Sequence, residues 1–143
     1  MKQLQGFELM TNTEPIRMSV HGKTVAELFL NCLRGMAEIM KPAALTAGAR
    51  AKKVTQTMRV EAVDLNTLLV EFLSETIGLS DINNLIFTHA TFKDIGDNFL
   101  EGEISGVPAG EIEREIKAVS YQDVDIRRNP KSGFYETTLV FEV

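Results

Sequence analysis

Hydrophobic residues recur at helical spacing in two segments of the chain, and residues at the ends of each segment are typical of helix boundaries. Before the first, residues 25–40, Thr24 and Glu27 form a capping-box pattern, and Pro42 follows it. Before the second, residues 65–77, Asp64 is placed as an N-cap, and Gly78 is placed to end the helix. The apolar stripes are Val25, Leu28, Phe29, Cys32, Leu33, Met36, Ile39 and Met40, and then Leu65, Leu68, Leu69, Phe72, Leu73 and Ile77.

Apolar and polar residues alternate in most of the remaining chain, which indicates strands. The expected strands are residues 6–10, 15–22, 53–63, 84–95, 98–107, 115–128 and 133–143, with a small-residue loop at 44–51. Residues 95–98 and the stretch NPKSG (129–133) have the composition of hairpin turns. The predicted order is ββ-α-β-α-ββ-ββ, which favours an α+β fold over a doubly wound sheet.

The stretch EIKAVSYQDVDIRR (115–128) raises a question about Lys117. Alternation places this lysine on one strand face with Val119 and Tyr121, and Asp123 and Asp125 continue in the same phase. One interpretation is that the lysine lies near an edge and its ammonium reaches water. The alternative is a functional lysine, and the pattern alone does not decide between the two.

Composition limits the classes of function. The 143 residues fit one domain that can bury a core without disulfides, and the formal net charge is −5. Direct nucleic-acid binding is not expected, since that needs a basic footprint and the basic clusters, at Arg50 to Lys53 and Arg127 to Arg128, are small. Cys32 is the only cysteine, which excludes an internal disulfide or a cysteine-based zinc site. Without a signal peptide or a membrane span, a cytoplasmic protein is expected.

The usual catalytic signatures are absent from the sequence. It has no glycine-rich phosphate loop, no HExxH motif and no serine nucleophile motif, and its two histidines, His21 and His89, provide little acid–base chemistry. Acids two residues apart, such as Asp123 and Asp125, usually mark a solvated strand face. An enzyme is therefore not expected.

A binding site for a hard cation such as Ca²⁺ or Mg²⁺ remains an open possibility, because such ions take oxygen ligands. The stretch TNTEP (11–15) offers Asn12, Thr13 and Glu14, and the end of the chain offers Glu142 and the Val143 carboxylate. These oxygens converge if the first and last strands are neighbours.

Several stretches together resemble the archease family, the small cofactor proteins that assist RtcB-type RNA ligases. GFELMTNTEPIRMSVHGKTVAELF is similar to the family's opening, in which H-T-A-D-I is followed by a strand, G-K-T and an amphipathic helix. DLNTLLVEFLSETIGLSDINNLIF resembles its second helix and next strand, and EISGVP resembles the short stretch that follows. EIKAVSYQDVDI and LVFEV resemble its K-A-V-T-Y-H motif and its final V-V-F-D-[VI]. The resemblance implies a single domain over 1–143, with a strand–helix–strand–strand scaffold interrupted by an inserted α/β module at roughly 50–110.

The resemblance also implies a function. It predicts an accessory protein that promotes guanylylation and turnover of an RtcB-type tRNA-splicing ligase, with Lys117 and Tyr121 as partner-contact residues beside a metal site. The family's H-T-A-D aspartate is Pro15 here, and its terminal aspartate is Glu142. A divalent cation, Ca²⁺ or Mg²⁺, would then take Glu142, Val143 and, in place of the lost aspartate, Glu14 as ligands. The alternative is a protein- or ligand-binding module that has lost the metal site and the ligase-activating role.

Overall fold

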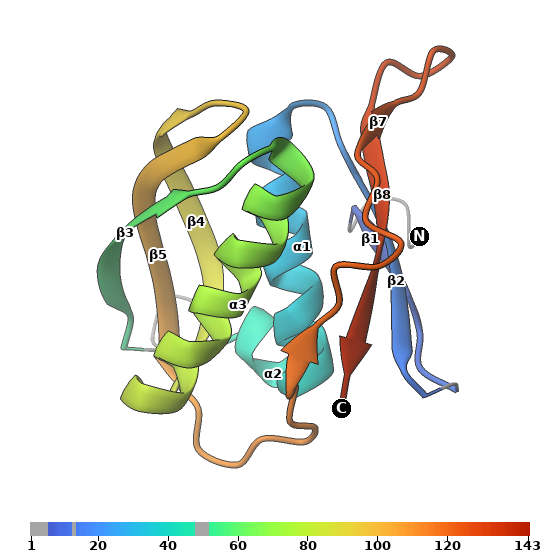
Figure 1. Ribbon diagram of the computed structural model, residues 1–143. Coiled ribbons are helices and arrows are strands. Elements are labelled where there is room, and N and C mark those ends of the chain that lie inside the picture. The colour runs from blue at the N-terminus through green and yellow to red at the C-terminus, as the bar shows by residue number, and fades with distance from the viewer. Residues whose placement is uncertain (1–5, 13, 48–51) are drawn as a thin grey trace.

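The computed structural model describes residues 6–12, 14–47 and 52–143, which fold into two sheets with helices between them (Figure 1). Thr13, Arg50 and part of the expected loop 44–51 lie outside the described residues. The elements are β1 (Phe7–Met10), β2 (Ile16–Gly22), α1 (Val25–Met40), α2 (Pro42–Leu45), β3 (Val54–Glu61), α3 (Leu65–Asn83), β4 (Leu85–Ile95), β5 (Phe99–Pro108), β6 (Ala118–Val119), β7 (Arg127–Arg128) and β8 (Tyr135–Glu142). The α+β class expected from the sequence is confirmed.

The larger sheet joins the two ends of the chain. Its strand order is β1-β2-β8-β6, and β7 also pairs with β8. All of these pairs are antiparallel, with Phe7 opposite Val20 and Ile16 opposite Phe141. The last strand therefore lies in the interior of the sheet, between a strand from the start of the chain and two short strands that precede it in sequence.

The smaller sheet contains only strands from the middle of the chain, in the order β3-β5-β4. β4 and β5 form the expected hairpin, and β4 has register shifts between Phe87 and His89 and between Phe92 and Asp94. Gly102 of β5 lies opposite the second shift, where a side chain would collide with the carbonyl oxygen of Thr91. The glycine thus permits a close approach of the two backbones at this bulge.

α1 and α3 occupy the layer between the sheets, as Figure 1 shows. α1 has the bounds that its periodicity predicts, and the Oγ1 of Thr24 accepts a 3.0 Å hydrogen bond from the N–H of Glu27. At its centre, Gly35 lies so close to Met18 of β2 that a side chain would meet the sulfur. The rings of Phe29, Phe72 and Phe92 then connect α1, α3 and the smaller sheet, with centroids 5.6–6.3 Å apart.

One predicted helix boundary is wrong, and one short helix is not predicted from the sequence. α3 continues through Gly78 to Asn83, because Gly78 faces open space while Ser80 beyond it is buried and donates a hydrogen bond to the carbonyl of Leu85. The left-handed residue that ends the helix is Asn84, with φ of 53°. Immediately after α1, the short helix α2 was not expected; it begins at Pro42, a residue type favoured in a first helical turn.

The expected long strand at 115–128 is also wrong, because only Ala118–Val119 and Arg127–Arg128 are strand. Asp123 adopts a left-handed backbone conformation, with φ of 68°, which breaks the extended chain. Beyond it, the N–H of Asp125 donates to Oγ1 of Thr137, and the N–H of Ile126 donates to Oδ1 of Asn66. These side-chain acceptors replace a regular strand ladder.

Candidate functional site

One end of β8 brings together most of the residues that the sequence singled out. Ala118 lies opposite Glu142, and the N–H of Lys117 donates a 2.7 Å hydrogen bond to the carbonyl of Glu142. On the other side of β8, Ile16 lies opposite Phe141. Continuing that register places Pro15 beside Glu142, since antiparallel partners step in opposite directions. The first strand, β1, is separated from β8 by β2, so the first and last strands are not direct neighbours. The neighbour of β8 is the second strand, β2, and the start of β2 brings Glu14 and Pro15 close to the end of β8.

The backbones of Lys117 and Glu142 are hydrogen-bonded, but their side chains do not form an ion pair. Both residues are exposed, and the ion pairs among the described residues do not include this pair. The register explains the difference, because Glu142 lies opposite Ala118 and neighbouring residues of an extended chain point to opposite faces. Lys117 thus reaches solvent beside the chain end, held in place through its backbone.

Glu14, the acid nearest to the lost aspartate position, already has a cationic neighbour. Its Oε1 lies 3.4 Å from Nη2 of Arg114, in the loop that leads to Lys117. The Glu14 side chain is 72% exposed, so this ion pair is weak and can open when a stronger ligand arrives. The partnership could not be inferred from sequence spacing, because 100 positions separate the two residues.

The acids near the end of β8 are not gathered into a compact cluster among the described residues. Pro15 provides no side-chain oxygen, and Glu14 pairs with Arg114. Across the described ranges, no three side chains of His, Cys, Asp or Glu come close enough together to hold one ion. The residues therefore do not fit a two-aspartate type of centre, and a divalent cation at Glu14, Glu142 and Val143 stays a prediction.

Tyr121, the second expected contact residue, does not lie on a strand with Lys117. It belongs to the turn after β6, is 58% exposed, and its hydroxyl donates a 2.6 Å hydrogen bond to Oε1 of Glu71 on α3. That hydrogen bond, with some desolvation and the nearby carboxylate charge, raises the pKa of the Tyr121 phenol. Glu71 carries no signal in the sequence, because it occupies an ordinary polar position on an amphipathic helix.

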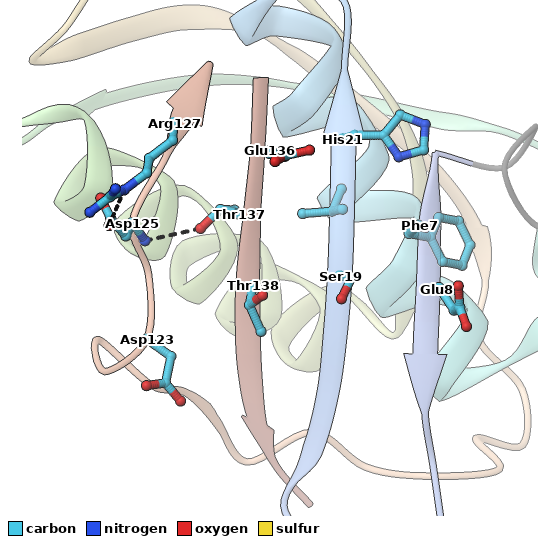
Figure 2. A pocket seen from close by; sticks show the side chains of 11 residues that line it. Phe7, Glu8, Ser19, His21, Asp123, Asp125, Arg127, Glu136, Thr137 and Thr138 are labelled. Atoms are coloured by element: carbon cyan, nitrogen blue, oxygen red, sulfur yellow. Dashed lines mark hydrogen bonds and ion pairs between the residues drawn. The ribbon is translucent and has the colours of Figure 1, made fainter. Parts of the chain in front are cut away.

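The outer face of the larger sheet carries a separate open trough of about 520 Å³ (Figure 2). Asp123 and Asp125 line it, and each pairs with an arginine: Arg17 lies 3.0 Å from Asp123, and Arg127 lies 2.6 Å from Asp125. All four side chains are largely exposed. The two acids therefore mark a solvated and charge-compensated face, as their spacing suggested.

Comparison with known proteins places the chain in a family. A sequence model of the Archease protein family (MTH1598/TM1083) matches residues 7–143. Protein archease of Methanosarcina acetivorans is 28% identical over 130 residues, covering 85% of this chain and 86% of that protein. Protein archease of Pyrococcus furiosus is 30% identical over 137 residues, covering 91% and 92%.

Two solved structures share the fold. The solution structure of Methanobacterium thermoautotrophicum protein 1598 has a TM-score of 0.67 and 22% identity, covering 97% of this chain and 99% of that one. The crystal structure of a Thermotoga maritima archease, described as a possible chaperone, has a TM-score of 0.61 and 16% identity, covering 89% of each chain. Within the described residues, no helix has the length and apolar content that crossing a membrane requires. The fold and the match across residues 7–143 lead to one conclusion: this chain belongs to the archease family.

Proposed function

We propose that this chain is a non-catalytic accessory protein that binds an RtcB-type tRNA-splicing RNA ligase and promotes its guanylylation and turnover. The observation that carries the proposal is the position of Lys117. This residue matches the lysine of the family motif, and it is exposed at the end of β8, where the start of β2 and the segment before β6 lie on either side of the last strand. A cation on a short, backbone-anchored segment is suited to reach into an anionic site of a partner.

The partner is a protein in this proposal rather than a nucleic acid. The formal net charge of −5 opposes direct association with RNA, because phosphate contacts require clustered lysine and arginine. Lys117 has acidic residues nearby in sequence at Glu113 and Glu115, so the segment as a whole is not basic. Contact with phosphate groups is therefore expected only inside the partner's own site.

A second candidate is a binding module that has kept the fold and lost ligase activation. The specific observation in its favour is the combination of Pro15 with the ion pair between Glu14 and Arg114. Together they leave the position of the first metal-binding aspartate of the family without a carboxylate, and the nearest acid, Glu14, already has a cationic neighbour. On this alternative, Lys117 is a remnant of the ancestral site.

A multiple-turnover ligation assay with an RtcB-type ligase from the same organism distinguishes the two candidates. Accessory function predicts that the wild-type protein raises both the turnover number and the guanylylated fraction of the ligase, and that Lys117→Ala abolishes both effects. Lys131→Ala is the matched control, because Lys131 is an exposed lysine in the distant hairpin loop between β7 and β8. Absence of stimulation by the wild-type protein would favour the binding module.

A further inference from the structure

β3 (Val54–Glu61) forms one edge of the smaller sheet, and its outer edge pairs with no strand in the described part of the chain. Figure 1 shows it at the rim of that sheet. Alternate residues of such a strand direct their backbone N–H and C=O groups away from the sheet, which makes the edge a template for another strand. Natural sheets usually protect such edges with bulges, prolines, short strands or charged side chains.

β3 has no bulge and no proline, and its charged residues, Arg59 and Glu61, lie in one half of the strand. Its register with β5 is unbroken from Val54 opposite Gly106 to Glu61 opposite Phe99, and it contains neither proline nor glycine. Two other edge strands differ from β3. β4, at the opposite edge of the smaller sheet, has two register shifts, and β1, at an edge of the larger sheet, has only four residues. β3 is thus a regular eight-residue edge that is competent to pair along its whole length.

An exposed hydrophobic residue marks the same edge. Val54 begins β3 and is 37% exposed, whereas Val60 near the other end is 5% exposed. Both lie on the face of β3 that is directed to the core, because they are an even number of residues apart. A strand added at this edge would cover Val54 with a residue of its own inner face.

The charges on β3 are complementary to those of a second copy in one register. On the outer face Lys53 precedes the strand and Glu61 ends it, with Thr57 midway. If two β3 strands pair antiparallel about a two-fold axis at Thr57, each Lys53 faces the Glu61 of the other copy. The same register places each Val54 opposite a Val60, so both faces of the strand are matched.

Neighbouring registers are less favourable. A two-fold axis at Met58 places Lys53 opposite Val63 and Glu61 opposite Thr55, and an axis at Gln56 places Lys53 opposite Arg59. Glu61 is free to change partners, because its ion pair with Arg59 is long, at 3.8 Å, and its side chain is 74% exposed. Of the three registers compared, all of which pair most of β3 with its copy, charge complementarity therefore favours the one with its two-fold axis at Thr57.

We propose that β3 is a homodimer interface, in which a second copy of this chain pairs antiparallel with β3 and merges the two smaller sheets into one. The interface is isologous, so each ionic contact occurs twice. It does not depend on the accessory function, since β3 belongs to the smaller sheet and the end of β8 belongs to the larger one.

Sedimentation velocity with charge-reversed variants tests both the dimer and its register. Wild-type protein is expected to dimerise in a concentration-dependent manner. Lys53→Glu alone or Glu61→Lys alone places like charges opposite each other twice, and each is expected to raise the dimer dissociation constant at least about tenfold. An equimolar mixture of the two variants restores opposite charges at both contacts, so heterodimers should form with near wild-type affinity.

Lys131→Glu is the matched control, because it makes the same charge change in the hairpin loop between β7 and β8 and should leave the dimer unchanged. A folding defect cannot imitate the expected result, since two misfolded variants would not recover association when mixed. A monomeric wild-type protein at the highest accessible concentration would overturn the proposal. Dimerisation that neither single variant weakens, or a mixture that stays monomeric, would also overturn it.

Discussion

The hydroxyl of Tyr121 donates a 2.6 Å hydrogen bond to the carboxylate of Glu71, which ties the turn after β6 to the surface of α3. Both groups remain accessible to solvent, and Tyr121 is 58% exposed. The turn that follows Lys117 is therefore held to α3 by the hydrogen bond between Tyr121 and Glu71. The Tyr121 phenol in this hydrogen bond loses its proton at alkaline pH.

Removal of the Glu71 carboxylate should lower the pKa of Tyr121 towards the ordinary value of about 10. The hydrogen bond to Glu71 favours the neutral phenol and raises the folded-state pKa, so its stabilising contribution is complete below the unfolded pKa. That contribution is lost as the pH rises through the folded value. Ultraviolet titration of tyrosinate in a Tyr135→Phe background isolates Tyr121, because the chain has two tyrosines.

Glu71→Ala in that background is compared with Glu75→Ala, which removes an exposed acid one turn further along α3. Only Glu71→Ala should shift the titration to lower pH. Identical titration curves for the two variants would show that the hydrogen bond does not persist in solution.

Lys117→Ala should leave the free energy of unfolding within about 1 kcal/mol of wild type. The side chain is exposed, and the hydrogen bond to Glu142 comes from the backbone, which alanine retains. Urea denaturation followed by circular dichroism measures the change. Unfolding of the variant, or a much larger loss, would assign a structural role to Lys117, and the ligation assay on this variant could then not be interpreted.

Leu28→Ala in α1 and Leu69→Ala in α3 should each lower the free energy of unfolding by roughly 2–5 kcal/mol. Both side chains are fully buried between the sheets, so truncation removes apolar contacts and leaves a cavity. Ile82→Ala is the matched control, since Ile82 lies near the end of α3 and is 79% exposed. The control should change stability by no more than about 0.5 kcal/mol. Unchanged denaturation midpoints for both leucine variants would contradict the observed packing.

Local signals predicted α1 well, because the Thr24 cap, the apolar stripe and Pro42 all act within a few residues. The end of α3 was missed because the effect of a glycine depends on what surrounds it, and Gly78 faces open space. The segment after Val119 was predicted as strand because Asp123 was assumed to be extended. Its actual path depends on acceptors from Thr137 and Asn66 that no local pattern reveals.

At the candidate site too, some features could be predicted from the sequence and others could not. Proximity of the N-terminal and C-terminal strands could be anticipated, although the strand that pairs with β8 is the second one, with Ile16 opposite Phe141, and not the first. The long-range partners of individual side chains could not, as Arg114 beside Glu14 and Glu71 beside Tyr121 show. Such pairs depend on how separate loops and helices dock, which alternation within a single strand does not encode.

The final prediction concerns metal affinity and the residue at position 15. Isothermal titration calorimetry with Ca²⁺ and with Mg²⁺ should give dissociation constants of about 1 mM or weaker for the wild-type protein, because the number of charged ligands sets affinity in such sites. Pro15→Asp returns a carboxylate to a position beside Glu142 and should strengthen binding at least about tenfold. Pro15→Asn, which adds an oxygen without the charge, is the matched control and should have a smaller effect. In the Pro15→Asp background, Glu142→Gln should reverse the gain if the two acids share the ion. Tight binding by the wild-type protein would mean that Glu14 leaves Arg114 and takes over as a ligand, and the same titration on Glu14→Gln would then lose it.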